Sequence, residues 1–201
     1  MQLIETKTAP NPRRVRIFMA EKGIVVPTEN RDLGSLKTEE FTKINPEQRV
    51  PVLILDDGTA ICETIAICRY FEEIQPEPAL MGRDATERAL VEMWQRRVEL
   101  GFFAHVAAAF RHKHPSMAQL EVPQIPEWGE ANKPKALEAL AKFNARLADT
   151  RFLAGDDYSI ADITLLVAVD FMKPARIVRP EGMTHFERWY SEVSSRPSAS
   201  A

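Results

Sequence analysis

The stretch from residue 49 to residue 64 reads Arg-Val-Pro-Val-Leu-Ile-Leu-Asp-Asp-Gly-Thr-Ala-Ile-Cys-Glu-Thr, and it decides the fold. Residues 52–55 are apolar, residues 56–58 are a hairpin turn signal, and residues 59–62 extend again, so the pattern predicts a β-hairpin. Pro51 opens the first strand, where its missing N–H removes no ladder bond. A helix is predicted to begin near Thr64. The unpaired N–H groups at that helix start favour an anion.

Upstream of the hairpin, strand and helix signals alternate. A helix is predicted to start with Asn11 as N-cap and Pro12 as its first residue, and to end at Gly23. Pro27 restricts the second strand to an edge of the sheet, because proline has no N–H to donate to a ladder. The other predicted elements are strands at residues 2–6 and 24–31 and a short helix at residues 39–44. This order predicts a mixed sheet of about four strands with right-handed crossovers between parallel strands.

Downstream of the hairpin, only helical signals follow. The helix from Thr64 runs to Ile74, and Gln-Pro-Glu-Pro at residues 75–78 breaks it. The features predicted beyond this break are a capping box at residues 84–87 that starts a helical stretch reaching His112, a loop at residues 113–132, a helix beyond Pro134, a capping box formed by Ser159 and Asp162, and a last helix capped by Thr184. We therefore predict an all-helical C-terminal half.

The composition is that of a globular protein, with 201 residues of which 45% are hydrophobic and 27% charged. A net charge of -3 without a basic block gives no support to nucleic-acid or anionic-membrane binding. The N-terminus lacks the pattern of a signal peptide and no apolar run reaches membrane length, so we expect a soluble cytoplasmic protein. Cys62 and Cys68 form neither a CxxC pair nor a zinc pattern, and we expect both to be buried and reduced.

Several other patterns in the sequence do not point to a function. His105, His112 and His114 lack the carboxylate or cysteine that would complete a metal set, so no metal is expected. The sequence contains no P-loop, no Gly-x-Gly-x-x-Gly and no Gly-x-Ser-x-Gly. An aromatic stripe on the long helical stretch is expected to be mostly core, with only part of it lining a pocket for an electrophile: Trp94, Phe102, Phe103 and Phe110.

The hairpin with its flanks resembles the glutathione transferase superfamily. In that family a cis proline follows a residue whose backbone pairs with the tripeptide as an added strand, and Val50 with Pro51 matches this place. The family's Glu/Gln-Ser/Thr pair at the start of the third helix matches Glu63 and Thr64. The resemblance implies that Thr64 and its N–H hold the γ-glutamyl carboxylate, while Glu63 faces the α-ammonium group.

The resemblance covers nearly the whole chain. It implies a glutathione transferase fold, with a thioredoxin-like α/β domain at residues 1–76, a linker at residues 77–83 and an all-α domain at residues 84–201. The pattern Gly-x-x-x-Ser-x-Ala-Asp at residues 155–162 matches the family's structural box in the second domain. Members of the family usually form homodimers, so a homodimer is expected.

The residue that activates the glutathione thiol departs from the family pattern. Family members use a Tyr on the first strand, or a Ser or Cys before the first helix, to favour the nucleophilic thiolate. Here the first tyrosine is Tyr70, and Ala9 occupies the serine position. Thr8 and Asn11 are the donors left in that turn, so they are the candidate catalytic residues, stabilising the sulfur electrostatically. Arg49 is a candidate contact for the glycyl carboxylate.

Each of these candidates has an ordinary structural alternative. Asn11 is also the predicted helix cap, Thr8 is also a loop hydroxyl that bonds its own backbone, and Arg49 is also a solvated charge beside a strand. Glu63 and Thr64 are also suited to a simple helix start. The choice between these roles depends on where the folded chain places the side chains.

Two functions from different classes fit the sequence. The first is a glutathione transferase-like enzyme that uses glutathione as cosubstrate and no metal, and that either conjugates it to a small apolar electrophile or reduces a disulfide. The second is a non-catalytic binding module that keeps the transferase fold for contacts with a partner, an alternative motivated by Ala9. Turnover of an electrophile or a disulfide separates them.

Overall fold

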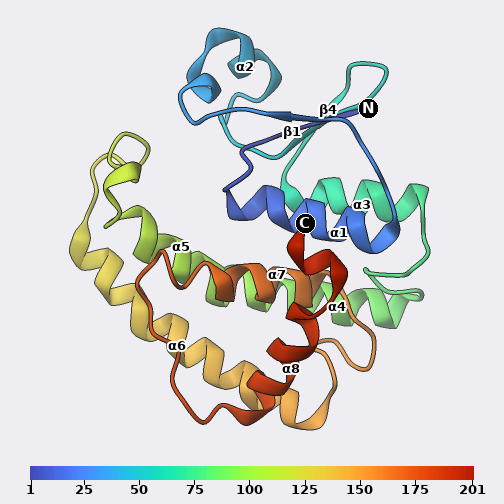
Figure 1. Cartoon of the computed structure of the whole chain (residues 1–201), viewed down its shortest axis with the longest axis vertical. Coiled ribbons are helices and arrows are strands. Elements are labelled where there is room, and N and C mark those ends of the chain that lie inside the picture. The colour runs from blue at the N-terminus through green and yellow to red at the C-terminus, as the bar shows by residue number, and fades with distance from the viewer. The chain divides into compact units, whose positions relative to one another are not determined.

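The computed structural model describes residues 1–201, and the chain divides into two compact units (Figure 1). The first unit comprises Met1–Leu80 together with Pro197–Ala201, and the second comprises Met81–Arg196. Buried apolar side chains form the core of each unit. No helix combines the length and the apolar character that crossing a membrane requires.

The first unit is built on a four-stranded mixed sheet with the strand order β2-β1-β3-β4. Its strands are β1 (Gln2–Glu5), β2 (Thr28–Asn30), β3 (Val52–Ile54) and β4 (Ala60–Cys62). β1 is parallel to β2 and antiparallel to β3, and β3 is antiparallel to β4. The predicted mixed sheet is confirmed. The strand predicted at residues 24–31 forms only at Thr28–Asn30, and it lies at an edge of the sheet, as predicted.

Helices cover both faces of this sheet. α1 and α3 pack side by side on one face and α2 lies on the other (Figure 1). Ile4 and Val52, which are paired across β1 and β3, pack with Leu36 and Phe41 in one apolar cluster. The helical elements of this unit are α1 (Pro10–Lys22), the 3-10 turn η1 (Ser35–Lys37), α2 (Glu39–Ile44), α3 (Thr64–Ile74) and the 3-10 turn η4 (Pro197–Ser200).

The hairpin forms as predicted. The N–H of Leu55 donates to the carbonyl of Thr59 at 2.8 Å, and the N–H of Gly58 donates to the carbonyl of Leu55 at 3.0 Å. Gly58 has a φ of +86°, a conformation that glycine adopts without steric cost. α3 follows directly and buries Ile67 and Phe71 completely, so its apolar spacing attaches the helix to the sheet.

The start of α1 differs from the prediction. The N-cap is Ala9, which makes no side-chain capping bond, and Pro10 is the first helical residue. Asn11, predicted as the cap, lies one residue inside the helix, and its Oδ1 accepts from Nη1 of Arg14 at 3.2 Å. The reason is that Pro10 and Pro12 remove two of the N–H groups that a cap would satisfy, and the fixed φ of Pro10 starts the helix early.

A buried ion pair closes the end of the first unit. Nζ of Lys22 lies 2.7 Å from Oε2 of Glu72, and both residues are less than a tenth exposed. The ammonium group also donates to the carbonyls of Gln75 and Pro78 at 2.7 Å each, and the N–H of Leu80 donates to the other oxygen of Glu72 at 3.0 Å. The Pro-rich segment after α3 is therefore tied to the C-terminal end of α1.

The second unit is all-helical, as predicted. Its elements are α4 (Ala85–Val98), the π-helical turn η2 (Glu99–Phe103), α5 (Ala104–Arg111), the 3-10 turn η3 (Pro115–Met117), α6 (Pro126–Asp149), α7 (Ile160–Asp170) and α8 (Thr184–Ser194). Nearly every residue of α7 is buried, so α7 is the central helix of this unit. The first three elements form the predicted long helical stretch, interrupted only by the π turn.

The predicted capping box at the start of α7 is confirmed. Ser159 is the N-cap, and the carboxylate of Asp162 accepts from the N–H of Ser159 at 3.1 Å and from its hydroxyl at 3.0 Å. The N–H of Leu153 and the indole N–H of Trp189 donate to the second carboxylate oxygen at 3.0 and 2.9 Å. Because Asp162 is fully buried, desolvation raises the pKa of its carboxyl group. The four hydrogen-bond donors act in the opposite direction, but their effect is smaller.

Two predictions in this unit are wrong. Residues 126–132 belong to α6 and not to a loop, because Pro126 is accepted at a helix start and Pro134, read as a boundary, lies inside the helix. Thr184 is the first helical residue of α8, and the N-cap position is held by Met183 without a side-chain capping bond. In both cases the true helix start carries no capping side chain.

Candidate functional site

The topology of the sheet brings the candidate residues to one edge of the sheet, the edge formed by the ends of the strands and not by an outer strand. β1 and β4 both run opposite to β3, so their C-terminal ends lie at the edge where β3 begins. α1 starts shortly after β1, and α3 starts directly after β4. The turn that contains Thr8, the approach to β3 at Val50 and the start of α3 at Thr64 therefore meet at this edge of the sheet.

The strand registers place Val50 at the centre of this edge. Val52 is paired with Ile4 of β1 and with Cys62 of β4. Val50 lies two residues before Val52, at the end of the sheet where β1 and β4 finish. The bond between Val50 and Pro51 is cis, as the resemblance implied. Val50 is half-buried and packs against the apolar cluster beneath the sheet.

The start of α3 presents backbone donors. Glu63 is the N-cap, makes no side-chain capping bond and is exposed. Its φ of +70° lies in the left-handed region, which costs a residue other than glycine on the order of 1–3 kcal/mol. The first intrahelical bond runs from the N–H of Ile67 to the carbonyl of Glu63, so the N–H groups of Thr64 and the next two residues precede it. Thr64 is only 5% exposed, which fixes its hydroxyl at the helix start.

The turn before Val50 depends on a residue that sequence reasoning missed. Asn45 is 4% exposed, and its Nδ2 donates to the carbonyl of Arg49 at 2.9 Å while its Oδ1 accepts from the N–H of Glu47 at 3.1 Å. The side chain thus holds the backbone immediately before Val50. The available signal was an Asn-Pro pair at the end of a short helix, which is typical of a turn held by the asparagine side chain. The Arg49 side chain itself is exposed.

The two candidate catalytic residues lie in and just after the turn between β1 and α1. Thr8 is exposed and precedes Ala9, the N-cap of α1. Asn11 is exposed in the first turn of the helix, where its carbonyl oxygen is engaged by Arg14. The amide NH2 of Asn11 and the hydroxyl of Thr8 are the donors that these two side chains contribute. Ala9 occupies the position of the family's serine, so a methyl group stands where that serine has its hydroxyl.

The cysteine nearest this edge is not an activated nucleophile. Cys62 ends β4, next to Glu63, and is partly buried, so the prediction that both cysteines are buried holds for Cys68 but is wrong for Cys62. Burial, and to a smaller extent the charge of Glu63, raise the pKa of the Cys62 thiol. A thiol with a raised pKa is mostly protonated at neutral pH and is a poor nucleophile. Neither cysteine takes part in a disulfide.

The histidines of the second unit have structural partners. Nδ1 of His105 lies 2.6 Å from Oδ1 of the buried Asn132, and Nδ1 of His112 accepts from the N–H of Ile125 at 3.1 Å. Nδ1 of His114 accepts from the N–H of Ser116 at 3.2 Å. No three His, Cys, Asp or Glu side chains are grouped so as to hold a metal ion.

Only part of the aromatic stripe is core, less than predicted, and Trp94 is partly exposed. Phe102 and Phe103 are buried and make edge contacts with Phe143 and Phe171, with ring centroids 5.8 and 6.2 Å apart. Phe110 is partly exposed and stacks on His114 at 4.5 Å. These contacts lie within the second unit.

Comparison with known proteins agrees with the fold. Residues 8–74 match the family model described as "Glutathione S-transferase, N-terminal domain", and residues 100–197 match "Glutathione S-transferase, C-terminal domain". The chain belongs to the glutathione S-transferase family. The predicted superfamily and fold class are thereby confirmed.

Individual relatives cover nearly all of the chain. "Glutathione S-transferase 2" of Saccharomyces cerevisiae is 34% identical over 98% of this chain and 87% of its own length. The mouse protein "Maleylacetoacetate isomerase" is 32% identical over 78% of this chain and 70% of its own. Among solved structures, a glutathione S-transferase domain-containing protein of Marinobacter aquaeolei has a TM-score of 0.95 and 38% identity, covering 98% of this chain and 99% of that one.

Proposed function

We propose that this chain is a glutathione-dependent transferase whose glutathione site lies at the sheet edge formed by Val50, Glu63 and Thr64. The observation that carries the proposal is the start of α3, where a buried threonine and three N–H groups precede the first intrahelical bond without a capping side chain. Such a helix start binds a carboxylate well. The names of the yeast and mouse relatives, a glutathione S-transferase and an isomerase, support an enzyme of this family.

The proposed binding mode follows from the registers. The tripeptide lies extended beside Val50 and bonds its backbone as an added strand. Its γ-glutamyl carboxylate accepts from the N–H and hydroxyl of Thr64, and its α-ammonium group faces the carboxylate of Glu63. The exposed side chain of Arg49 contacts the glycyl carboxylate. The left-handed backbone of Glu63, an unusual conformation for this residue type, orients its side chain toward that ammonium group.

We propose that Thr8 and Asn11 stabilise the glutathione thiolate by donating hydrogen bonds to the sulfur. Neither side chain removes a proton at neutral pH, so their contribution is electrostatic, and the thiol proton passes to solvent. In conjugation, the thiolate sulfur forms a bond to an electrophilic carbon of a small apolar cosubstrate. In disulfide reduction, the thiolate attacks one sulfur of a disulfide, forms a mixed disulfide and releases the other sulfur as a thiolate.

The binding claim is tested by titrating glutathione into wild type and into Thr64→Ala. We expect the dissociation constant to rise about tenfold in the variant, because a hydrogen bond to a charged group is lost. Thr28→Ala, a substitution of an exposed threonine in β2, is the matched control and leaves affinity unchanged. Wild-type protein that shows no glutathione binding defeats the proposal.

The second candidate function is a non-catalytic binding module, and Ala9 favours it. Two assays separate it from the enzyme: conjugation of a chlorinated nitroaromatic compound, and reduction of a small mixed disulfide. For the enzyme we expect turnover in at least one assay, with a lower rate at saturating glutathione in Thr8→Val or Asn11→Ala. Glutathione binding with no turnover in either assay supports the binding module. A normal rate in both variants would remove Thr8 and Asn11 from the mechanism while leaving the enzyme in place.

We further propose that the protein acts in the cytoplasm, in detoxification of electrophiles, and that it is a homodimer. The dimer is proposed because members of the family usually form homodimers. Its test is the mass in solution, where a homodimer gives twice the mass of one chain and a monomer contradicts the proposal.

A further inference from the structure

The first turns of α1 contain the only buried arginine of the chain, Arg14. Its side chain is 1% exposed, although arginine is almost never fully buried unless its donors have partners. The residues packed around the same stretch of helix include Val15, Ile17 and Phe18, all completely buried. A side chain enclosed in this way is held in one conformation, so the position of the Arg14 guanidinium group is fixed.

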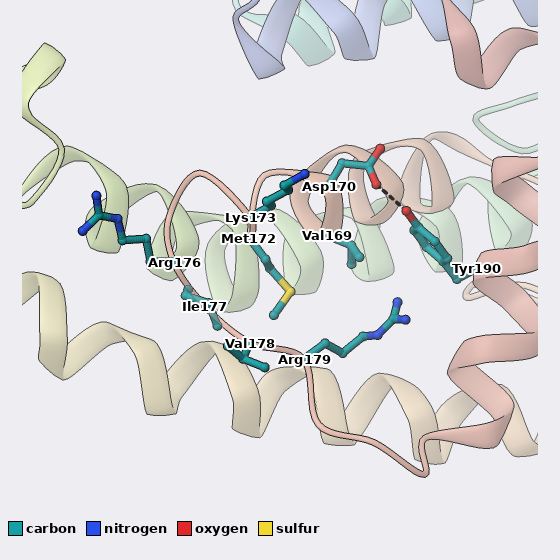
Figure 2. Close-up of a pocket in the computed structure, with 9 residues that line it drawn as sticks. All are labelled: Val169, Asp170, Met172, Lys173, Arg176, Ile177, Val178, Arg179 and Tyr190. Atoms are coloured by element: carbon teal, nitrogen blue, oxygen red, sulfur yellow. Dashed lines mark hydrogen bonds between the residues drawn. The ribbon is translucent and has the colours of Figure 1, made fainter.

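Two arginines of the second unit show the more usual placement. Arg176 and Arg179 line a pocket of about 730 Å³ at the end of α7 (Figure 2). In Figure 2 the exposed Arg176 extends away from the other labelled side chains, and the partly exposed Arg179 extends toward Tyr190. Both side chains keep contact with solvent. The complete burial of Arg14, close to the turn that carries the candidate catalytic residues, therefore calls for a specific role.

Arg14 determines which way round the side-chain amide of Asn11 lies. The two residues are three positions apart on one face of the helix, and Nη1 of Arg14 donates to Oδ1 of Asn11 at 3.2 Å. A guanidinium group has donors only and stays charged in proteins, so it accepts no bond from the amide NH2 group. The amide oxygen must face Arg14, and the NH2 group is turned away from it. Because Asn11 is exposed, this NH2 group is accessible to a ligand.

The rest of the first helical turn offers few other donors. Pro10 and Pro12 have no N–H group, and Ala9 has no polar side chain. The N–H of Ala9 already donates to a carbonyl of the preceding turn at 2.9 Å. Donation from this turn to a thiolate therefore depends on Asn11, together with the hydroxyl of Thr8. A hydroxyl rotates to suit its partner, whereas the amide of Asn11 has a direction that Arg14 sets.

Building on the proposed role of Asn11 as a donor to the thiolate, we propose that Arg14 is a positioning residue for thiol activation. Its guanidinium group holds the amide oxygen of Asn11 and thereby directs the NH2 group toward the glutathione sulfur. Arg14 acts through Asn11 and does not touch glutathione. It prevents the amide from turning its oxygen toward the negative sulfur, and its charge polarises the amide so that the NH2 group donates more strongly.

The test measures the thiolate of bound glutathione by its ultraviolet absorbance as a function of pH, with the site saturated. We expect the thiolate fraction at neutral pH to fall about tenfold in Asn11→Ala, because a hydrogen bond to a charged group is lost. In Arg14→Met we expect a fall of about fivefold, the effect of leaving one side chain unordered. Arg14→Met made in the Asn11→Ala background produces no further fall, because the amide through which Arg14 acts is gone.

The adjacent arginine supplies the matched control. Nη2 of Arg13 donates to the carbonyl of Ala199 at 3.0 Å, and Arg13 has no printed role in the turn before α1, so Arg13→Met leaves the thiolate fraction unchanged. Circular dichroism and the unfolding midpoint check that each variant is folded.

Two further variants protect the test against misfolding of Arg14→Met. Arg14→Lys keeps a cation that only donates, so we expect a smaller fall in the thiolate fraction than in Arg14→Met. Asn11→Asp changes an exposed residue, keeps an acceptor for Arg14 and removes the NH2 group. We expect its thiolate fraction to be no higher than that of Asn11→Ala, because a carboxylate repels the thiolate.

The outcomes separate this role of Arg14 from the proposed function. A wild-type thiolate fraction in Arg14→Met, with a low fraction in Asn11→Ala, overturns the role of Arg14 and leaves that of Asn11 in place. Equal falls caused by Arg14→Met in the presence and absence of the Asn11 amide also overturn it, since Arg14 then acts independently of the amide. A wild-type fraction in Asn11→Ala or Asn11→Asp overturns both roles.

Discussion

The reactivity of the Cys62 thiol is a measure of the electrostatic environment at the sheet edge. Burial and the neighbouring charge of Glu63 raise the pKa of Cys62 above its ordinary value. A raised pKa leaves little thiolate at neutral pH, so alkylation is slow there and accelerates as the pH rises. We expect iodoacetamide to react with Cys62 more slowly than with a free cysteine at pH 8, and not with the buried Cys68 in the native protein.

The same measurement separates the two causes of the shift. Glu63→Gln removes the like charge and leaves the burial, so the alkylation rate at pH 8 rises by roughly twofold, the effect of one exposed charge. Asp57→Asn, at the other end of the hairpin, is the control and leaves the rate unchanged. A Cys62 that reacts as fast as a free cysteine at neutral pH contradicts the expected environment.

Most residues of the candidate glutathione site could be predicted from the sequence, but Asn45 and Asn11 could not be placed correctly. The hairpin turn and the helix start are local signals, and strand order alone then brings Val50 and Thr64 to one edge. Asn45 was missed because its role, holding the carbonyl of Arg49, depends on burial that no local pattern reveals. Asn11 was misplaced because the prolines on either side of it, Pro10 and Pro12, offer two possible helix starts.

At the scale of helices, α7 and α8 differ in how they begin, and this predicts different responses to mutation. Asp162 accepts four hydrogen bonds in a fully buried setting, two of them from Leu153 and Trp189 outside the box. Asp162→Ala leaves those donors unsatisfied, and we expect a loss of about 3 kcal/mol or more in the free energy of unfolding. Urea denaturation followed by circular dichroism measures it.

The contrasting helix supplies the control. Thr184 makes no capping bond at the start of α8 and is exposed, so Thr184→Ala changes stability by less than about 0.5 kcal/mol. Equal destabilisation by the two substitutions contradicts the assignment of the cap. The sequence contains a capping-box pattern at both sites, and only the packing of Trp189 against Asp162 distinguishes them.

At the scale of the whole molecule, the proposed function predicts linkage between glutathione and folding. A ligand that binds only the folded state at a hundred times its dissociation constant stabilises that state by about 2.7 kcal/mol. We expect glutathione at that concentration, determined from its titration with wild type, to raise the unfolding midpoint of the protein. The readout is thermal unfolding with and without the tripeptide.

Thr64→Ala serves as the comparison for this measurement. At the same glutathione concentration its weaker binding produces a smaller increase in the unfolding midpoint, whereas Thr28→Ala behaves as wild type. An equal increase in Thr64→Ala and wild type places the bound tripeptide elsewhere in the molecule. This experiment is independent of turnover, so it tests the site even for a non-catalytic protein.

The sequence by itself determined the order of the elements, the hairpin at residues 52–62 and the all-helical second half, because periodicity and turn chemistry act over a few residues. Only the tertiary structure decided that α6 begins at Pro126, since a proline is acceptable both inside a loop and at a helix start. It alone also brought the guanidinium group of Arg179 against the rings of Phe186 and Tyr190. Such groupings arise from packing between segments distant along the chain, and the free energy that selects them has no local signature.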